Sequence, residues 1–203
     1  MDLKLLIRLA VSLGLLMGAC GGDDITLTEY VEQVNVAAEA ASQKGAELLA
    51  DAARMTDPTP AQLQAGLERA LREIRIPLQD AIDDIAPPDQ LADLHDLMWD
   101  WHASFISIEQ ALAARFGTAD DTQAGWEALS DSPEMAAYRV ALAEGKQVCD
   151  GFQSELDDIA ALGVFADTPW MPGELQNVVD AALGCQSFPD RPEDVYRYPP
   201  PTP

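Results

Sequence analysis

Residues 91–117, LADLHDLMWDWHASFISIEQALAARFG, carry the pattern that decides the fold class. Their large apolar side chains recur at steps of three and four, the spacing that brings residues onto one face of an α-helix. The positions are Leu91, Leu94, Met98, Trp101, Phe105, Ile108 and Leu112. An average step of about 3.5 residues keeps such a stripe in line along a neighbouring helix. Gly117 is a typical residue for the end of the helix.

Three further segments of the chain repeat this helical spacing. The first runs from Leu27 to Met55, and it opens with Thr26 and Glu29, the capping-box pattern of a helix N-terminus. Its stripe includes the small residues Ala38, Ala41, Gly45 and Ala52. We therefore expect the large aromatic residues of segment 91–117 to lie against this small-residue stripe.

The other two segments have equally clear boundaries. One runs from residue 59 to 85 and opens with Thr59 and Pro60, an N-cap followed by proline at the first helical position. Pro77 lies inside it and predicts a kink or break, because proline removes a backbone donor and crowds the preceding turn. The last segment runs from 132 to 163 and ends at a glycine.

These four segments predict an all-α protein, an antiparallel four-helix bundle that spans residues 26–185. A short C-terminal helix is expected around residues 174–183. Residues 186–203 form a Pro-rich tail, for which extended polyproline geometry is expected. The sequence shows no series of alternating apolar and polar residues that would indicate strands.

The composition agrees with a folded helical domain and argues against one class of partner. Of the 203 residues, 48% are hydrophobic and 6% are aromatic, which is typical of an aliphatic core. Acidic residues outnumber basic residues 35 to 12, and the net charge is -23. Because nucleic acids present negative phosphates, we expect no nucleic-acid partner.

The N-terminus has the pattern of an export signal. Within residues 1–19, Lys4 and Arg8 flank a short apolar run that ends in small residues. A helix that spans a bilayer takes about 20 apolar residues, so this run is too short for one. The sequence therefore predicts a signal peptide over residues 1–19.

Residues 16–20, LMGAC, resemble the lipobox of bacterial lipoproteins, with Met17 where that family usually has leucine. The resemblance implies cleavage before Cys20 and attachment of a diacylglyceryl group, with acyl chains such as palmitate, to the Cys20 thiol. Residues 20–25 would then be the lipidated cysteine and a flexible tether. The implied location is extracytoplasmic, with the lipid on Cys20 as the membrane anchor at the bacterial envelope.

Cys149 and Cys185 remain as a pair once Cys20 is lipidated. An exported protein meets an oxidising environment, where an even pair of cysteines predicts a disulfide. The bond would close a loop of roughly 37 residues and stabilise the fold by roughly 4 kcal/mol, if it acts by restricting the unfolded chain.

His95 and His102 are the two histidines, and hence the weak candidates for a metal or haem site. Seven helical residues separate them by about 10.5 Å, whereas a zinc–nitrogen bond is about 2.0 Å, so one ion cannot bind both. Neither histidine belongs to the Glu-x-x-His pair of di-iron bundles. We therefore expect no metal and no cofactor, and we expect both histidines at the solvent-exposed edge of their stripe.

Motifs of known catalytic centres are absent from the sequence. It contains no Gly-x-Ser-x-Gly, no His-Glu-x-x-His and no phosphate-binding glycine loop, so the chain is not predicted to be an enzyme. The expected function is that of a membrane-tethered binding or interaction module, with an envelope protein or a small ligand as its partner. The alternative is a helical bundle that binds metal or haem through His95 or His102 and handles ions or electrons.

Overall fold

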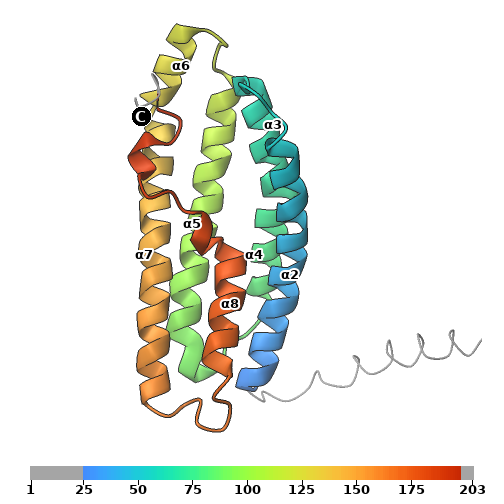
Figure 1. Cartoon of the computed structure of the whole chain (residues 1–203), viewed down its shortest axis with the longest axis vertical. Helices are drawn as coiled ribbons and strands as arrows, with labels where there is room; N and C mark the ends of the chain where they lie inside the picture. Colours follow the sequence, from blue (N-terminus) through green and yellow to red (C-terminus); the bar gives the residue numbers. More distant parts are fainter. Residues whose placement is uncertain (1–24, 198–203) are drawn as a thin grey trace, which may run out of the picture.

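A computed structural model describes residues 25–197, and every regular element in this range is helical (Figure 1). The all-α prediction is thus confirmed for this part of the chain. The α-helices are α2 (Leu27–Ala52), α3 (Pro60–Ala70), α4 (Ile76–Asp83), α5 (Ala92–Gly117), α6 (Gln123–Ser130), α7 (Pro133–Ala161) and α8 (Met171–Leu183), and the shorter helical segments are η1 (Leu71–Arg75), η2 (Asp89–Leu91), η3 (Cys185–Ser187) and η4 (Pro192–Asp194). Over residues 25–197, no helix combines the length and the apolar character that crossing a membrane requires.

The predicted capping box at Thr26 and the predicted N-cap at Thr59 begin their helices as expected. At the start of α2, Thr26 Oγ1 accepts the Glu29 N–H at 3.2 Å, and the Glu29 carboxylate accepts the Thr26 N–H at 2.9 Å. Thr59 and Gln62 make the same reciprocal pair of bonds at the start of α3. Each box satisfies backbone N–H groups that have no partner inside the helix, and so fixes where the helix begins.

The interruption predicted at Pro77 takes the form of a π-helix just before it. Segment η1, Leu71–Arg75, joins α3 to α4. Pro77 has no N–H to offer the carbonyl of Glu73, and its ring crowds that carbonyl. The wider π-helical turn accommodates both effects, so that α3 and α4 continue in one direction in Figure 1.

α5 lies at the centre of the helix packing. It contacts α7 on one side and α3, η1 and α4 on the other, while α2 packs mainly against α8 and α4. In Figure 1, α8 rises between α2 and α7 in the lower half of the molecule. The largest buried apolar cluster draws on α2, α4, α5, α7 and α8 and includes Val34, Ile82, Met98, Phe152 and Val179.

The second half of α2 differs from the prediction. Its stripe is buried as far as Ala41, whereas Ala52 and Met55 are exposed. Nothing lies within 4 Å of the position that a Cβ on Gly45 would take. The physical reason is the length of α8, which has 13 residues against the 26 of α2 and runs beside the lower part of α2 (Figure 1).

Trp101 packs against Gly145 of α7, and the expected packing against Gly45 of α2 was wrong. A Cβ on Gly145 would lie 2.4 Å from Cζ2 of Trp101 and 2.6 Å from Cζ of Phe188. The Trp101 indole N–H donates to the carbonyl of Ala141, also in α7, at 3.3 Å. α5 and α7 therefore approach closely at this level because the glycine has no side chain.

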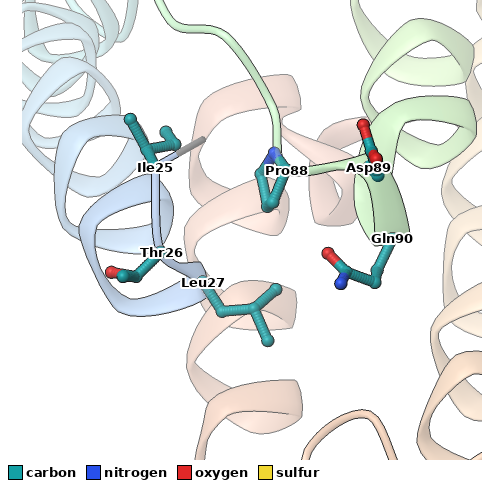
Figure 2. A pocket seen from close by; sticks show the side chains of 6 residues that line it. All are labelled: Ile25, Thr26, Leu27, Pro88, Asp89 and Gln90. Carbon is teal, nitrogen blue, oxygen red and sulfur yellow. The ribbon is translucent and has the colours of Figure 1, made fainter. Parts of the chain in front are cut away.

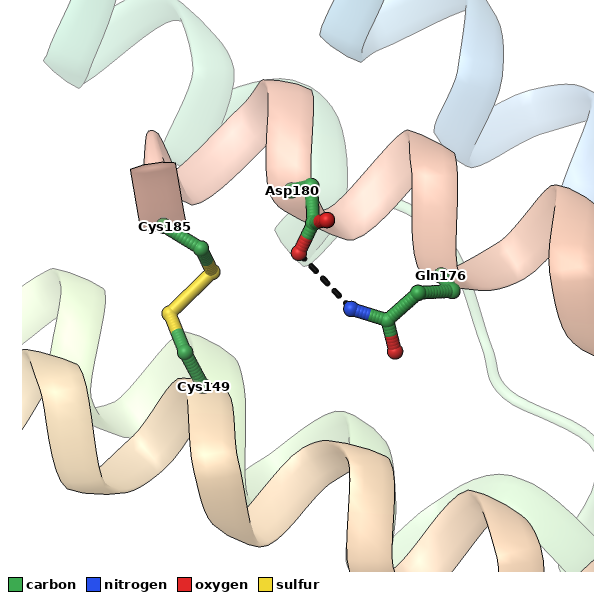
Figure 3. The surroundings of a disulfide bond; sticks show 4 residues. All are labelled: Cys149, Gln176, Asp180 and Cys185. Carbon is green, nitrogen blue, oxygen red and sulfur yellow. Dashed lines mark hydrogen bonds between the residues drawn. A yellow bond between two sulfur atoms is a disulfide. The ribbon is translucent and has the colours of Figure 1, made fainter. Parts of the chain in front are cut away.

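The structure joins Cys149 of α7 to Cys185, which follows α8, in the disulfide that the sequence predicts. Their Cα atoms are 5.9 Å apart. Figure 3 shows the bond crossing from the side of α7 to the C-terminal end of α8, next to the hydrogen bond from Gln176 Nε2 to Asp180 Oδ1 of 2.7 Å. The disulfide thus holds the end of α8 against α7.

Residues 186–197, the first part of the predicted tail, pack along α5 and α7, and the helical turn η4 interrupts the extended polyproline geometry that was expected for them. Phe188 fills the space above the α7 glycine, and the Arg139 Nε–H donates to the carbonyl of Val195 at 2.9 Å. This part of the tail covers the upper half of the α5–α7 pair. The remaining prolines of the tail, in residues 198–203, lie outside the described residues.

Candidate functional site

α5 carries a second stripe of inward-facing residues beside the predicted one. Its members are His95, Trp99, His102, Ile106, Glu109, Ala113 and Phe116, at alternating steps of four and three. All but the first are buried. α5 buries both stripes because helices cover it on two sides. The alternating spacing is visible in the sequence, and it is the signal from which the burial of polar residues could have been predicted.

His102 is fully buried and belongs to a hydrogen-bonded chain. Its Nδ1 lies 2.7 Å from Oε1 of Gln79 in α4, and Nε2 of Gln79 donates to Asp83 Oδ1 at 2.7 Å. Because the Gln79 nitrogen serves Asp83, its oxygen is the acceptor, and the proton sits on Nδ1 of His102. The position expected for His102, at a solvent-exposed edge, is therefore wrong.

His95 bonds a different helix. Its Nδ1 lies 3.0 Å from the hydroxyl of Tyr30 in α2. Trp99 stands between the two histidines, with its ring centroid 6.3 Å from that of His95 and 5.8 Å from that of His102. The two imidazoles thus face separate partners on separate helices. Tyr30, His95, Trp99, His102 and Gln79 together form a polar line that connects α2, α5 and α4.

Burial favours the uncharged form of each titratable group in this line. It lowers the pKa of His102 to about 3, and the positive charge of Arg75 acts in the same direction. It also lowers the pKa of His95, against the opposing effect of nearby aspartates. Burial raises the pKa of Tyr30, while a polar contact with Trp99 acts the other way. Tyr30, His95 and His102 are therefore uncharged at pH 7.

The stripe also contains an ion pair whose carboxylate is buried. Glu109, which is 3% exposed, lies with its Oε2 3.4 Å from Nε of Arg75, the last residue of η1. The Arg75 guanidinium also lies over the ring of Phe105, 5.6 Å from its centroid. Burial raises the pKa of the Glu109 carboxyl, and Arg75 lowers it. The pair links the π-helical turn to α5.

Neither histidine contributes to a metal site in the described structure. Within residues 25–197, no group of three or more His, Cys, Asp or Glu side chains is placed to hold a metal ion. His95 and His102 each use Nδ1 in a hydrogen bond to a different helix. The positions of the two imidazoles therefore suit hydrogen bonds from α5 to neighbouring helices.

Figure 2 shows a pocket of about 200 Å³ at the lower end of the domain, between the start of α2 and the segment before α5. Ile25, Thr26, Leu27, Pro88, Asp89 and Gln90 line it. Asp89 is the one charged side chain among them, and the lining brings no histidine, cysteine or basic residue. The pocket adjoins Ile25, the first described residue, where the predicted tether joins the domain.

Charge is distributed unevenly along the molecule. Residues 25–43, 76–114 and 147–190 contain carboxylates throughout but no Lys or Arg. These ranges hold most of the lower half of the domain in Figure 1. The basic residues of the described chain lie in the remaining segments, which come from the middle and the upper half. The end that adjoins the tether is therefore acidic, and the opposite end has both signs of charge.

The predicted lipidation site, Cys20, lies outside the described residues. The length of the chain nevertheless limits how far it can be from the domain. The chain between Cys20 and Ile25 spans at most about 18 Å when fully extended. A lipid on Cys20 would hold the lower end of the domain within this distance of a membrane.

No protein-family model, no curated protein and no solved structure matches this chain. Its function is therefore inferred from its own residues and fold.

Proposed function

We propose that this chain is a lipoprotein, anchored through Cys20 to a bacterial envelope membrane, whose helical domain is a binding or interaction module and not an enzyme. The observation that supports the module is that the polar side chains of the second α5 stripe serve contacts between helices. The buried polar residues of α5 bond neighbouring helices, and the pocket of Figure 2 brings no basic residue and no nucleophilic cysteine. Such a domain would therefore bind its partner on its outer surface.

We also propose that the domain is an antiparallel four-helix bundle with a short C-terminal helix. Its four members would be α2, the α3–α4 helix, α5 and α7, which run lengthwise in Figure 1. The connections between them support this assignment, because short loops favour antiparallel neighbours. α8 contacts both α2 and α7 and so would close the side of the bundle between them.

The end away from the tether is the half that an aqueous partner would meet first. Large apolar side chains are exposed there, among them Leu49 of α2 at 71% and Val140 of α7 at 56%. Basic side chains also lie in this half, including Arg54 and Arg115. A surface with both charge signs and exposed apolar groups suits a protein partner better than a polyanion.

Photo-crosslinking in the native envelope tests this proposal. We expect a photoreactive residue at Leu49 or Val140 to give a discrete crosslinked product with a second envelope component. Val36, which is equally exposed at 70% but lies nearer the tether, is the matched control position. If neither upper position gives a product beyond that of Val36, the interaction module is contradicted.

The metal or haem alternative predicts a different result for the purified domain. Bound haem would give a strong visible absorption band, and a bound metal would appear in elemental analysis at about one ion per chain. We expect neither. A stoichiometric metal or a haem spectrum that disappears when His95 or His102 is replaced would support the alternative and contradict the proposal.

A further inference from the structure

The loop between α7 and α8 has apolar side chains exposed at both of its ends. Leu162, directly after α7, is 83% exposed, and Trp170, directly before α8, is 55% exposed. Between them Phe165 is 4% exposed and belongs to the main buried cluster, so the loop is fixed to the core at its middle. Leu162 and Trp170 are therefore exposed on a loop that the buried Phe165 fixes to the core.

This loop is also poor in charge. Asp167 is the one charged residue between positions 159 and 173, in a chain of which 23% of the residues are charged. Gly163, with φ of +80°, makes the turn that leaves α7. The loop thus presents a leucine and a tryptophan on a nearly uncharged tip, although the surrounding helices carry many carboxylates.

The loop lies at the end of the molecule where the tether begins. Figure 1 shows the start of α2 and the α7–α8 loop together at the lower end, and Ile25, Val164 and Phe165 share the same buried cluster. The chain from Cys20 to Ile25 reaches at most about 18 Å. An anchor on Cys20 would therefore bring the loop to the membrane surface, whereas α6 would be about 39 Å away, the length of the 26-residue α5.

We propose that Leu162 and Trp170 enter the headgroup region of the membrane that holds the Cys20 anchor, and so fix the orientation of the domain on a zwitterionic lipid surface. This inference rests on the proposed lipid anchor. Tryptophan suits this position because its ring is apolar and its N–H is polar, the combination that concentrates it at membrane interfaces. Anionic headgroups would repel the acidic lower half of the domain, so the lipid surface that we propose is zwitterionic.

Quenching by brominated lipids tests the proposal. The chain from residue 20 onward holds every described helix, and with Cys149 and Cys185 oxidised, Cys20 is its one free thiol. That thiol is coupled to a maleimide lipid in phosphatidylcholine vesicles, with or without brominated acyl chains, and coupling is verified by mass. We expect bromine to remove up to about a quarter of the emission, since Trp170 is one of four tryptophans.

Two matched pairs of variants locate the contact. Trp170→Phe should abolish the bromine effect, while Trp126→Phe, in α6 at the far end, should keep it. Leu162→Asp should reduce the effect at least about twofold, and Leu49→Asp should leave it unchanged, although both leucines are highly exposed. Circular dichroism verifies that all four variants keep the helical content of the parent.

The proposal is overturned if fully coupled protein shows no bromine effect, or if the effect follows Trp126. It is also overturned if Trp170 emission changes with the density of coupled protein and not with bromine, because the loop would then bind a second copy. Chemical coupling makes these results independent of processing in the cell. Failure of the proposed lipoprotein would appear separately, in the mass of Cys20 from the native host.

Discussion

The His102 imidazole stays neutral because burial removes the water that would solvate its charged form. Its Nδ1–H is committed to Gln79, and the nearby Arg75 further disfavours a second positive charge. The pKa of the folded-state imidazole is about 3, against 6.5 for the exposed side chain. The unfolded chain therefore binds a proton below about pH 6.5 that the folded chain does not bind, and acid favours unfolding in the interval between the two values.

We expect His102→Gln to weaken the pH dependence of stability. Between pH 7 and pH 5, protonation of this histidine in the unfolded chain should cost the wild type about 2 kcal/mol, whereas glutamine takes up no proton. Denaturant unfolding at the two pH values measures the difference. His95→Gln is the comparison: burial also lowers the pKa of His95, but this imidazole is only half-buried, so its replacement should weaken the pH dependence less than His102→Gln. Equal pH dependence in wild type and His102→Gln would contradict the neutral buried imidazole.

At this scale, local chemistry could be predicted directly, whereas the burial of His102 was indicated only by the alternating spacing of the second α5 stripe. Thr26 with Glu29 and Cys149 with Cys185 follow from residue type and spacing, because capping and oxidation depend on few neighbours. The burial of His102 depends on which helices cover α5. The first apolar stripe of α5 alone places this histidine at an exposed edge, whereas helices on two sides of α5 bury it.

Among the helices, the contact of α5 with α7 is set by Gly145. The glycine leaves room for Trp101 and for Phe188, so one missing side chain lets α5, α7 and the tail meet. Gly45 in α2 has the same residue type inside a long helix, but nothing lies within 4 Å of its Cβ position. Comparing the same substitution at Gly145 and Gly45 therefore distinguishes the effect of packing from the effect of helix propensity.

Alanine at these two positions should have opposite effects. Gly145→Ala should lower the free energy of unfolding by about 1–3 kcal/mol, because its methyl group collides with Trp101 and Phe188. Gly45→Ala should raise it by about 0.5–1 kcal/mol, because alanine is the better helix former. Denaturant titration measures both. Stabilisation by both substitutions would show that α5 and α7 are not in close contact at this level.

The disulfide should matter most for α8. Replacing Cys149 and Cys185 together by serine should lower the free energy of unfolding by up to about 4 kcal/mol, because the unfolded chain regains the freedom that the bond removed. It should also speed proteolysis within residues 171–197 relative to α5. Limited digestion with mass mapping detects this. Unchanged stability and unchanged cleavage would mean that packing alone holds α8.

Helix existence and helix starts could be predicted from the sequence, but helix partners could not. The periodic stripes and the caps are local signals, and Pro77 indicated the irregular turn that became η1. The insertion of α8 beside the lower part of α2 leaves no local signal. For this reason the exposed second half of α2 and the true partner of Trp101 were missed.

The whole molecule is polarised along its length. Ile25, the pocket of Figure 2 and the α7–α8 loop all lie at the acidic lower end, and the basic residues of the described chain lie toward the other end. Because net negative charge is repelled by anionic lipid, electrostatic attraction cannot attach this end to such a membrane. Attachment therefore depends on the acyl chains, each buried methylene of which contributes about 0.8 kcal/mol.

The mass of the N-terminal peptide from the native host tests the central claim most directly. The account predicts a chain that begins at Cys20 and carries the added mass of a diacylglyceryl group. Cys20→Ser should lose this mass and remain unprocessed at that site, while the helical content of the domain stays unchanged. A wild-type chain that begins at another residue, or that begins at Cys20 without acyl mass, would contradict the lipoprotein.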